Sequence, residues 1–287
     1  MRAPGLYDIT ASLCGEKTIM RTQTEPSTRE TTQVGFERSD HEVLSFPVGR
    51  VDVWRVHLHP AENVAGDGGG RSLSTATALS ADEIARANRF HFQKDRLRFS
   101  RSRSVLRHLI ANYSGIPAAE VIFDYLPNGK PQLAAAQNPR GLQFNVSHSA
   151  GIALIAFGCG CRLGIDVEKI RLEVDAIALA KRFFSARELA GLEALPQQLL
   201  ADAFFACWTR KESFLKAIGI GLSFPLDDFS VTTEPDLDPV LEEIKGDREA
   251  GKRWQLANIE AGEGYRATVA TDGVHSDVIV RDYKSNI

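Results

Sequence analysis

The order of the predicted elements constrains this fold most, because the same succession of strands and helices comes twice along the chain. Alternating and helical apolar patterns separate strands from helices. The first half contains strands at 51–58, 121–125, 142–146 and 152–157, with helical spacing from Ser80 to Ser114. The second half contains strands at 163–167, 229–232, 253–259, 265–270 and 278–280, with helices at 174–184 and 197–218. This order predicts an α+β protein of two similar halves, related by a pseudo-two-fold axis, each a small antiparallel sheet packed with a long helix.

Local signals mark where the helices begin and end. Ser80 with Glu83, and Ser185 with Glu188, have the spacing of capping boxes, so each pair is expected to start a helix. Gly219 and Gly221 follow the long second helix, and glycine at this position favours the left-handed conformation that ends a helix.

The predicted halves set the domain boundaries and the place of the site. Residues 1–45 are expected to form a disordered tail, because residues 21–34 are polar and lack periodicity, and Met20 is a second candidate start. The first half is expected at 46–163 and the second at 164–283, with a flexible loop at 66–70. A site between two such halves is the natural expectation.

Composition excludes several classes of protein. With 43% hydrophobic and 25% charged residues, the chain is neither wholly disordered nor collagen-like. It has neither a run of apolar residues that would cross a membrane nor the apolar core of a secretory signal. Its four cysteines lack zinc-type spacing and are expected to be reduced. These features predict a cytoplasmic protein with no membrane contact.

The charge is concentrated in one segment. The formal net charge is −3, yet the segment from Arg86 to Arg107 carries eight Arg or Lys residues and one acid, Asp95. With Phe90, Phe92 and Phe99 interleaved, such a segment suits single-stranded nucleic acid. On a helix, however, the phenylalanines are expected in the core and the arginines outside, where some are suited to hold phosphate.

Three short stretches carry residues suited to phosphate chemistry. Asp166 and Glu168 alternate with Ile165 and Val167 on a strand, so both carboxylates face the same side of the strand. They are interpreted either as ligands of a Mg²⁺ ion or as two solvated acids. Glu212 and Lys216 lie one helical turn apart. They are interpreted either as a third carboxylate of the metal site and a phosphate-binding cation, or as an ion pair on the helix surface.

The third stretch places Ser147 next to His148. Neighbouring residues on a strand point to opposite faces, so the two are not expected to form a nucleophile and its base. Two interpretations of this stretch remain: a turn at the strand end that binds an anion, or a capped turn with a structural histidine.

Together, these stretches resemble the Sfp-type 4′-phosphopantetheinyl transferases. The ordered motifs span roughly 54–232 and are GKP at 129–131, FNVSHS at 144–149, GIDVE at 164–168, RFFS at 182–185, WTRKES at 208–213 and KAIGIGL at 216–222. The resemblance implies the fold of that family and the transfer of phosphopantetheine from coenzyme A to a serine of an apo acyl- or peptidyl-carrier protein, releasing 3′,5′-ADP. It also implies that the protein does not act on nucleic acid. By analogy with the family, the chain length implies that the protein is a monomer.

The resemblance also implies roles for single residues. The metal ligands would be Asp166, Glu168 and Glu212, which hold Mg²⁺ on the pyrophosphate, and Glu212 is the candidate base. The coenzyme A contacts would be Lys216 on the β-phosphate, His148 on the pyrophosphate, and Ser147, Lys130 and Arg86 on the 3′-phosphate.

The chain departs from the family pattern near the expected 3′-phosphate site. Glu83 stands where a basic residue is usual, and Phe99, followed by Ser100, stands where a hydroxyl residue is usual. Arg89 and Arg98 are candidate substitutes. Two alternatives stay open: a nucleic-acid or scaffold protein that uses the basic segment, and another Mg²⁺-dependent phosphoryl-transfer enzyme or hydrolase acting on a nucleotide-like phosphate ester.

Overall fold

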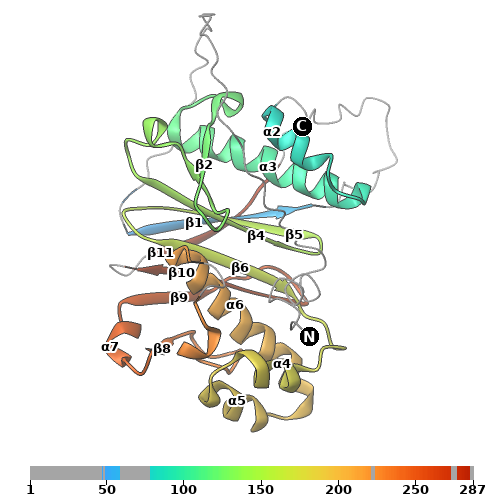
Figure 1. The fold of residues 1–287 in the computed structure, drawn as a ribbon, viewed down its shortest axis with the longest axis vertical. Coiled ribbons are helices and arrows are strands. Elements are labelled where there is room, and N and C mark those ends of the chain that lie inside the picture. The colour runs from blue at the N-terminus through green and yellow to red at the C-terminus, as the bar shows by residue number, and fades with distance from the viewer. Residues whose placement is uncertain (1–46, 48, 59–77, 221–223, 273–276, 285–287) are drawn as a thin grey trace, which may run out of the picture.

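The protein is built from four layers, helix, sheet, sheet and helix. The structure, a computed structural model, describes residues 47, 49–58, 78–220, 224–272 and 277–284. In Figure 1 the two sheets lie at the centre, with α3 above them and α6, α4 and α5 below. The predicted tail at 1–45, the loop at 66–70 and Gly221 lie outside the described residues. Over the described ranges, no helix combines the length and the apolar character that crossing a membrane requires.

The first sheet has the strand order β11-β1-β5-β4. Its strands are β1 (Arg50–His57), β4 (Leu142–Ser149), β5 (Ile152–Cys159) and β11 (Asp277–Asp282). The pairs β1–β5 and β4–β5 are antiparallel, whereas β11 runs parallel to β1 with Val53 opposite Val280. Thus β11, which falls in the range expected for the second half, completes the sheet of the first half.

One face of the first sheet is covered by α3 (Gln93–Ser114), which α2 (Ala81–Ala87) precedes. The α3 residues that pack on this face are Val105, Leu106, Leu109, Ile110 and Tyr113. The predicted capping box of Ser80 and Glu83 starts α2, and Gly115 ends α3 with φ of 77°. A short hairpin of β2 (Phe123–Tyr125) and β3 (Pro131–Leu133) follows.

The second sheet has the order β6-β10-β9 and carries the helix α6 on its outer face (Figure 1). Its elements are β6 (Leu163–Lys169), β9 (Trp254–Asn258), β10 (Tyr265–Asp272) and α6 (Leu200–Ile218). The elements packed on α6 are α4 (Ala176–Phe183), α5 (Ala186–Glu193) and β7 (Phe229–Val231). The strand β8 (Leu241–Ile244) pairs with β7, and α7 (Arg248–Gly251) packs against β8. The described part of the chain also contains 3₁₀ helices at Ala118–Glu120, Ala135–Gln137, Gln197–Leu199 and Leu226–Asp228. As predicted, Gly219 ends α6 in the left-handed region, with φ of 72°.

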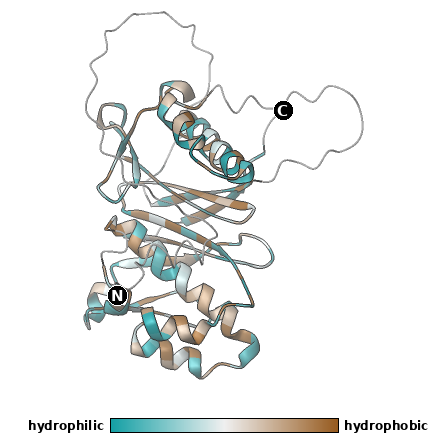
Figure 2. Cartoon of the chain, turned by 45° about the vertical axis from the view of Figure 1, so that its right-hand side comes forward, coloured by the Kyte–Doolittle hydropathy of each residue, from teal (hydrophilic) through white to brown (hydrophobic). Residues whose placement is uncertain are grey.

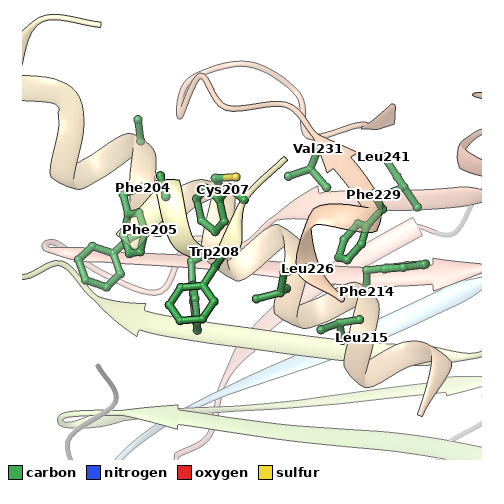
Figure 3. Close-up of a cluster of buried hydrophobic side chains, with 14 of the residues drawn as sticks. Phe204, Phe205, Cys207, Trp208, Phe214, Leu215, Leu226, Phe229, Val231 and Leu241 are labelled. Carbon is green, nitrogen blue, oxygen red and sulfur yellow. The ribbon is translucent and has the colours of Figure 1, made fainter. Parts of the chain in front are cut away.

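Three hydrophobic clusters hold these layers together. One lies between α3 and the first sheet, and one between the two sheets, where Leu154 of β5 and Ile165 of β6 are completely buried. The third surrounds α6 and includes Phe204, Trp208 and Phe214 (Figure 3). Figure 2 shows the same distribution, with hydrophobic strands at the centre and hydrophilic residues on the outer helical surfaces. Burial of this apolar surface is the main stabilising term of the fold.

A single glycine sets how closely α6 approaches the second sheet. A Cβ atom on Gly164 of β6 would lie 2.1 Å from the carbonyl oxygen of Ser213 and 2.4 Å from the backbone nitrogen of Ala217. Both contacts are with backbone, so no side-chain rotation relieves them. The close approach brings the last turn of α6 over β6.

We therefore expect Gly164→Ala to lower the free energy of unfolding by about 3 kcal/mol or more, because α6 must move outward. Chemical denaturation measures this loss. Gly158→Ala is the matched control on β5, since its Cβ would approach nothing closer than the Sγ of Cys161, at 3.1 Å. Equal losses in the two variants would contradict the packing described here.

The basic segment differs from its prediction in two ways. First, α2 ends at Ala87, so most of its charges lie on α3 and not on the helix that Ser80 starts. Second, its phenylalanines are not core residues. Phe92 is 46% exposed, and Phe90 and Phe99 are half-buried against each other. The reason is that the core-facing part of α3 begins only about Ser102, more than two turns into the helix.

Candidate active site

The two sheets meet where the edge strands β4 and β6 lie side by side, and side chains of β4 replace a backbone ladder between them. Three polar residues of β4 accept hydrogen bonds from backbone amides of β6. The pairs are Ile165 N to Asn145 Oδ1 at 2.8 Å, Val167 N to Ser147 Oγ at 3.4 Å, and Lys169 N to Ser149 Oγ at 3.1 Å. We call this junction the seam. It satisfies backbone donors at a sheet edge that would otherwise be buried without partners.

Asp166 and Glu168 lie on this seam. As predicted, they alternate with Ile165 and Val167, which pack between the sheets, so the two carboxylates face the α6 side together with Gly164. Both acidic residues are completely buried. Ser147 Oγ donates to Asp166 Oδ1 at 2.8 Å, and Ser149 Oγ donates to Glu168 Oε2 at 2.8 Å. Burial and these partners exclude the interpretation as two solvated acids.

The last two turns of α6 bring Glu212 and Lys216 to the same region. Both are half-buried on a helix whose neighbouring residues are mostly buried. The Lys216 ammonium donates to Asp166 Oδ1 at 2.6 Å and to Ser147 Oγ at 3.0 Å. Lys216 therefore binds across the seam, and the alternative of a simple surface pair with Glu212 does not describe it.

The residues at the seam fit a divalent cation in part. The Oδ2 atom of Asp166 is buried and has no hydrogen-bond partner among the described residues, which suits a hard cation. However, no three His, Cys, Asp or Glu side chains in the described part of the chain lie close enough to hold a metal ion together. Asp166, Glu168 and Glu212 therefore stay the predicted ligand set, and in this structure Asp166 Oδ1 meets the Lys216 ammonium at 2.6 Å.

Lys130 connects the first half to the end of α6. Its ammonium donates to the carbonyl oxygens of Leu163, at 2.9 Å, and Lys216, at 2.7 Å. Burial, and secondarily the nearby charge of Lys216, lower the pKa of Lys130 to about 8. The turn at 127–129 places Lys130 beside the start of β6 and the end of α6.

The other two predicted coenzyme A residues, His148 and Arg86, lie on the first half. His148 is exposed on β4, and the alternation of that strand places it on the face opposite Ser147, so the two do not form a catalytic pair. Arg86 is exposed on α2, with its guanidinium 5.5 Å from the centre of the Phe99 ring. Ser147, in contrast, is buried, and its hydroxyl points to Asp166 and Lys216.

The unusual Glu83 has a structural reason. Its side chain is 1% exposed and lies 2.6 Å from Arg107 Nε and 2.9 Å from Arg103 Nε. Arg107 also donates to the carbonyl oxygens of Ala118 and Val121. Two arginines of the basic segment are therefore internal, and α3 covers the face of the first sheet turned away from the second sheet. Most of the basic segment belongs to α3 and therefore lies on that face of the first sheet.

Two charged residues of the WTRKES motif hold α6 in place. Lys211 is completely buried and donates to Glu188 at 2.6 and 2.7 Å and to the carbonyl oxygen of Phe229 at 2.6 Å. Arg210 donates to four carbonyl oxygens, those of Thr232, Glu234, Pro235 and Leu237. These contacts fix the helix turn that carries Glu212. Neither residue is marked by the sequence as structural, because a Lys or Arg beside polar residues is typical of an exposed helical face.

Sequence analysis also missed Asn145 and Ser149 as functional supports. Their signal was present, since Asn145, Ser147 and Ser149 repeat with a period of two and so share one strand face. What that face contacts depends on β6, which lies elsewhere in the chain.

Comparison with known proteins gives a consistent result along both halves. The family profile described as the 4′-phosphopantetheinyl transferase superfamily matches residues 162–270, and the profile described as 4′-phosphopantetheinyl transferase, N-terminal, matches residues 71–159.

Individual relatives agree. The chain is 36% identical over 230 residues to the 4′-phosphopantetheinyl transferase HetI of Nostoc sp., covering 80% of this chain and 91% of that protein. It is 32% identical over 158 residues to the 4′-phosphopantetheinyl transferase Sfp of Bacillus subtilis, covering 55% and 68%. It is 29% identical over 227 residues to the human L-aminoadipate-semialdehyde dehydrogenase-phosphopantetheinyl transferase, covering 73% and 74%.

Proposed function

The chain belongs to the 4′-phosphopantetheinyl transferase superfamily, and from this premise we propose how its seam transfers phosphopantetheine from coenzyme A to a carrier protein. The proposal covers the residues that act, Mg²⁺ as the metal, 3′,5′-ADP as the product, and an apo acyl- or peptidyl-carrier protein as the acceptor. The observation that carries it is the convergence of Asp166, Ser147 and Lys216 across the seam. The cytoplasmic location and the monomeric state stay predictions.

The reaction needs positive charge at a pyrophosphate. The carrier serine oxygen forms a bond to the β-phosphorus, the bond from that phosphorus to the bridging oxygen breaks, and 3′,5′-ADP leaves with the electron pair. Lys216 and Lys130 supply two ammonium groups at the seam, close enough for the charge of one to lower the pKa of the other. Lys216, on the exposed side of α6, is placed to hold the β-phosphate and to stabilise charge that grows on it.

The carboxylates complete the site. Asp166, together with Glu168 and Glu212, would hold Mg²⁺, which when bound offsets the charge of the pyrophosphate oxygens. Glu212, one helical turn before Lys216, accepts the serine proton directly or through a water. Because the described residues assemble no group of three ligands, we assign the remaining positions to the substrate and water, as is usual for Mg²⁺.

Ser147 takes a different role from the predicted contact with the 3′-phosphate. Its buried hydroxyl donates to Asp166 and accepts from Lys216, so we propose that it orients the Asp166 carboxylate. Ser149 does the same for Glu168. His148 and Arg86, both exposed, stay the proposed contacts for phosphates of coenzyme A.

The pKa of Lys130 gives a prediction for ligand binding. A group with a folded-state pKa of about 8 loses its charge above that pH, while an ordinary lysine keeps it up to about 10.5. If Lys130 contacts a phosphate, the Kd for adenosine 3′,5′-bisphosphate is expected to rise with pH, by at most about tenfold per pH unit, once Lys130 loses its proton. Isothermal titration calorimetry from about pH 7 to about pH 10 measures this dependence.

The arginine variant provides the control. Lys130→Arg keeps its charge over the whole range, so its Kd is expected to stay nearly constant. A Kd with the same pH dependence in both proteins would show that Lys130 does not meet the phosphate. The same shift has a consequence for stability. Because the unfolded chain binds the extra proton between the two pKa values, Lys130 favours the folded state more as pH rises through that window.

Transfer to a carrier separates this function from the hydrolytic alternative. The protein is mixed with coenzyme A, Mg²⁺ and a panel of apo acyl- and peptidyl-carrier proteins, and intact mass spectrometry detects one added phosphopantetheine. A carrier whose acceptor serine is replaced by alanine is the control. Release of 3′,5′-ADP without any carrier would indicate a hydrolase instead.

A further inference from the structure

The Lys216 ammonium sits where the charge of a metal ion is expected. Its three N–H groups match three acceptors, namely Asp166 Oδ1 at 2.6 Å, Ser147 Oγ at 3.0 Å and the carbonyl oxygen of Ile165 at 3.2 Å. The Asp166 side chain is 1% exposed, while that of Lys216 is 22% exposed. One partner of the ion pair is therefore fixed inside the protein, and the other reaches in from the surface.

This ion pair conflicts with cation binding at Asp166. A divalent cation on Asp166 would lie close to the ammonium, and two positive charges in a buried setting repel each other strongly. The ammonium also neutralises the carboxylate that would attract the cation. In the ligand-free protein, Lys216 is thus a competitor for Asp166.

Only the side chain of Lys216 is free to change place. The backbone at this turn is fixed, because Lys130 Nζ binds the Lys216 carbonyl oxygen at 2.7 Å and Gly164 holds α6 against β6. The lysine stem, in contrast, is long and has several rotatable bonds. A pyrophosphate at the seam offers more negative charge than the single oxygen of Asp166 that Lys216 now binds.

We propose that Lys216 is an exchangeable counter-ion, which blocks Asp166 in the free enzyme and moves to the pyrophosphate when coenzyme A binds. The proposal rests on the proposed function and adds an order of ligand binding to it. The divalent cation binds Asp166 tightly only when coenzyme A is present. Coenzyme A and the cation therefore bind cooperatively. By thermodynamic linkage, the cation strengthens coenzyme A binding by the same factor.

The test measures Mn²⁺ binding to the full-length, ligand-free protein by isothermal titration calorimetry, with no catalysis involved. Lys216→Met removes the competing charge and is expected to bind Mn²⁺ at least about tenfold more tightly than the wild type, within the usual range of coupling between sites. Lys216→Arg keeps the charge and is expected to bind as weakly as the wild type. Lys181→Met is the matched control, because Lys181 lies on the exposed face of α4, paired with Glu193.

A second variant protects the test against loss of folding. Lys216→Gln keeps a hydrogen-bond donor for Asp166 and lacks the charge, so it should show the same gain as Lys216→Met. Mn²⁺ without coenzyme A should also raise the Tm of both variants more than that of the wild type, since the cation replaces the missing partner of Asp166.

Coenzyme A completes the comparison. It should strengthen Mn²⁺ binding in both proteins, because its pyrophosphate supplies ligands, but by a factor at least about fivefold larger in the wild type than in Lys216→Met. Adenosine 3′,5′-bisphosphate, which lacks the pyrophosphate, should add little in either protein. Mn²⁺ affinity that is equal or lower in Lys216→Met overturns the exchange. Transfer to a carrier, measured separately on the wild type, decides the proposed function, so the two failures are distinguishable.

Discussion

Replacing Asp166 by asparagine is expected to reduce the transfer of phosphopantetheine by at least about 10³-fold, because it removes both the partner of Lys216 and the buried oxygen proposed for Mg²⁺. The shape of the side chain is unchanged and Ser147 keeps an acceptor, so the protein should remain folded. The rate at which the mass of the carrier shifts gives the activity, and circular dichroism confirms the fold.

Asp272→Asn is the matched control for this prediction. Asp272 lies on β10, next to β6, and pairs with Arg162 at 2.6 Å, yet it is away from the seam. Its variant should transfer at nearly the wild-type rate. Near-normal transfer by Asp166→Asn would show that the acidic centre of the reaction lies elsewhere.

The largest expected effect on stability comes from Glu188. This buried carboxylate accepts hydrogen bonds from Lys211 Nζ, from Val231 N at 2.9 Å and from Ser185 N at 2.8 Å, and so connects α5, α6 and β7. Glu188→Ala leaves the Lys211 ammonium buried without a counter-charge. We expect the free energy of unfolding to fall by about 3–5 kcal/mol, as measured by chemical denaturation.

A double-mutant cycle separates the cause from simple loss of packing. If the buried charge of Lys211 is the problem, adding Lys211→Met to Glu188→Ala should recover part of the lost stability. Glu249→Ala, which breaks an exposed pair with Lys252, should have no effect beyond the error of the measurement. Losses that simply add in the double variant would contradict this explanation.

Local patterns in the sequence were sufficient for most of the secondary structure. Helix starts at Ser80 and Ser185 and the helix end at Gly219 were predicted, because capping depends on residues within one turn. The orientation of Asp166 and Glu168 was predicted for a similar reason, since a strand alternates its faces whatever surrounds it.

Contacts between distant parts of the chain could not be predicted in this way. The parallel pairing of β11 with β1 joins residues more than 200 positions apart, and β8, a short strand, was not predicted at all. The same holds for the site. Its motifs identified Asp166, Lys216 and Lys130, but the hydrogen bonds of Ser147 and the ion pair of Lys216 follow from how β4, β6 and α6 meet.

The buried charges show a further limit of sequence patterns. Glu83 was interpreted as a departure from a phosphate site, yet it forms ion pairs with Arg103 and Arg107 inside the first half. Lys211 was given no role, yet it is completely buried. A charged residue is usually exposed, so burial of a charge becomes evident only when its partner, here Glu188, is seen beside it.

The central claim is that the seam between the two halves transfers phosphopantetheine to a carrier protein, and the intact mass of an apo carrier tests it most directly. After incubation with the wild-type protein, coenzyme A and Mg²⁺, at least one carrier of the panel should gain one phosphopantetheine on its serine, and none should with Asp166→Asn. A folded wild-type protein that modifies no carrier, or an Asp166→Asn variant that modifies one at the wild-type rate, would contradict the claim.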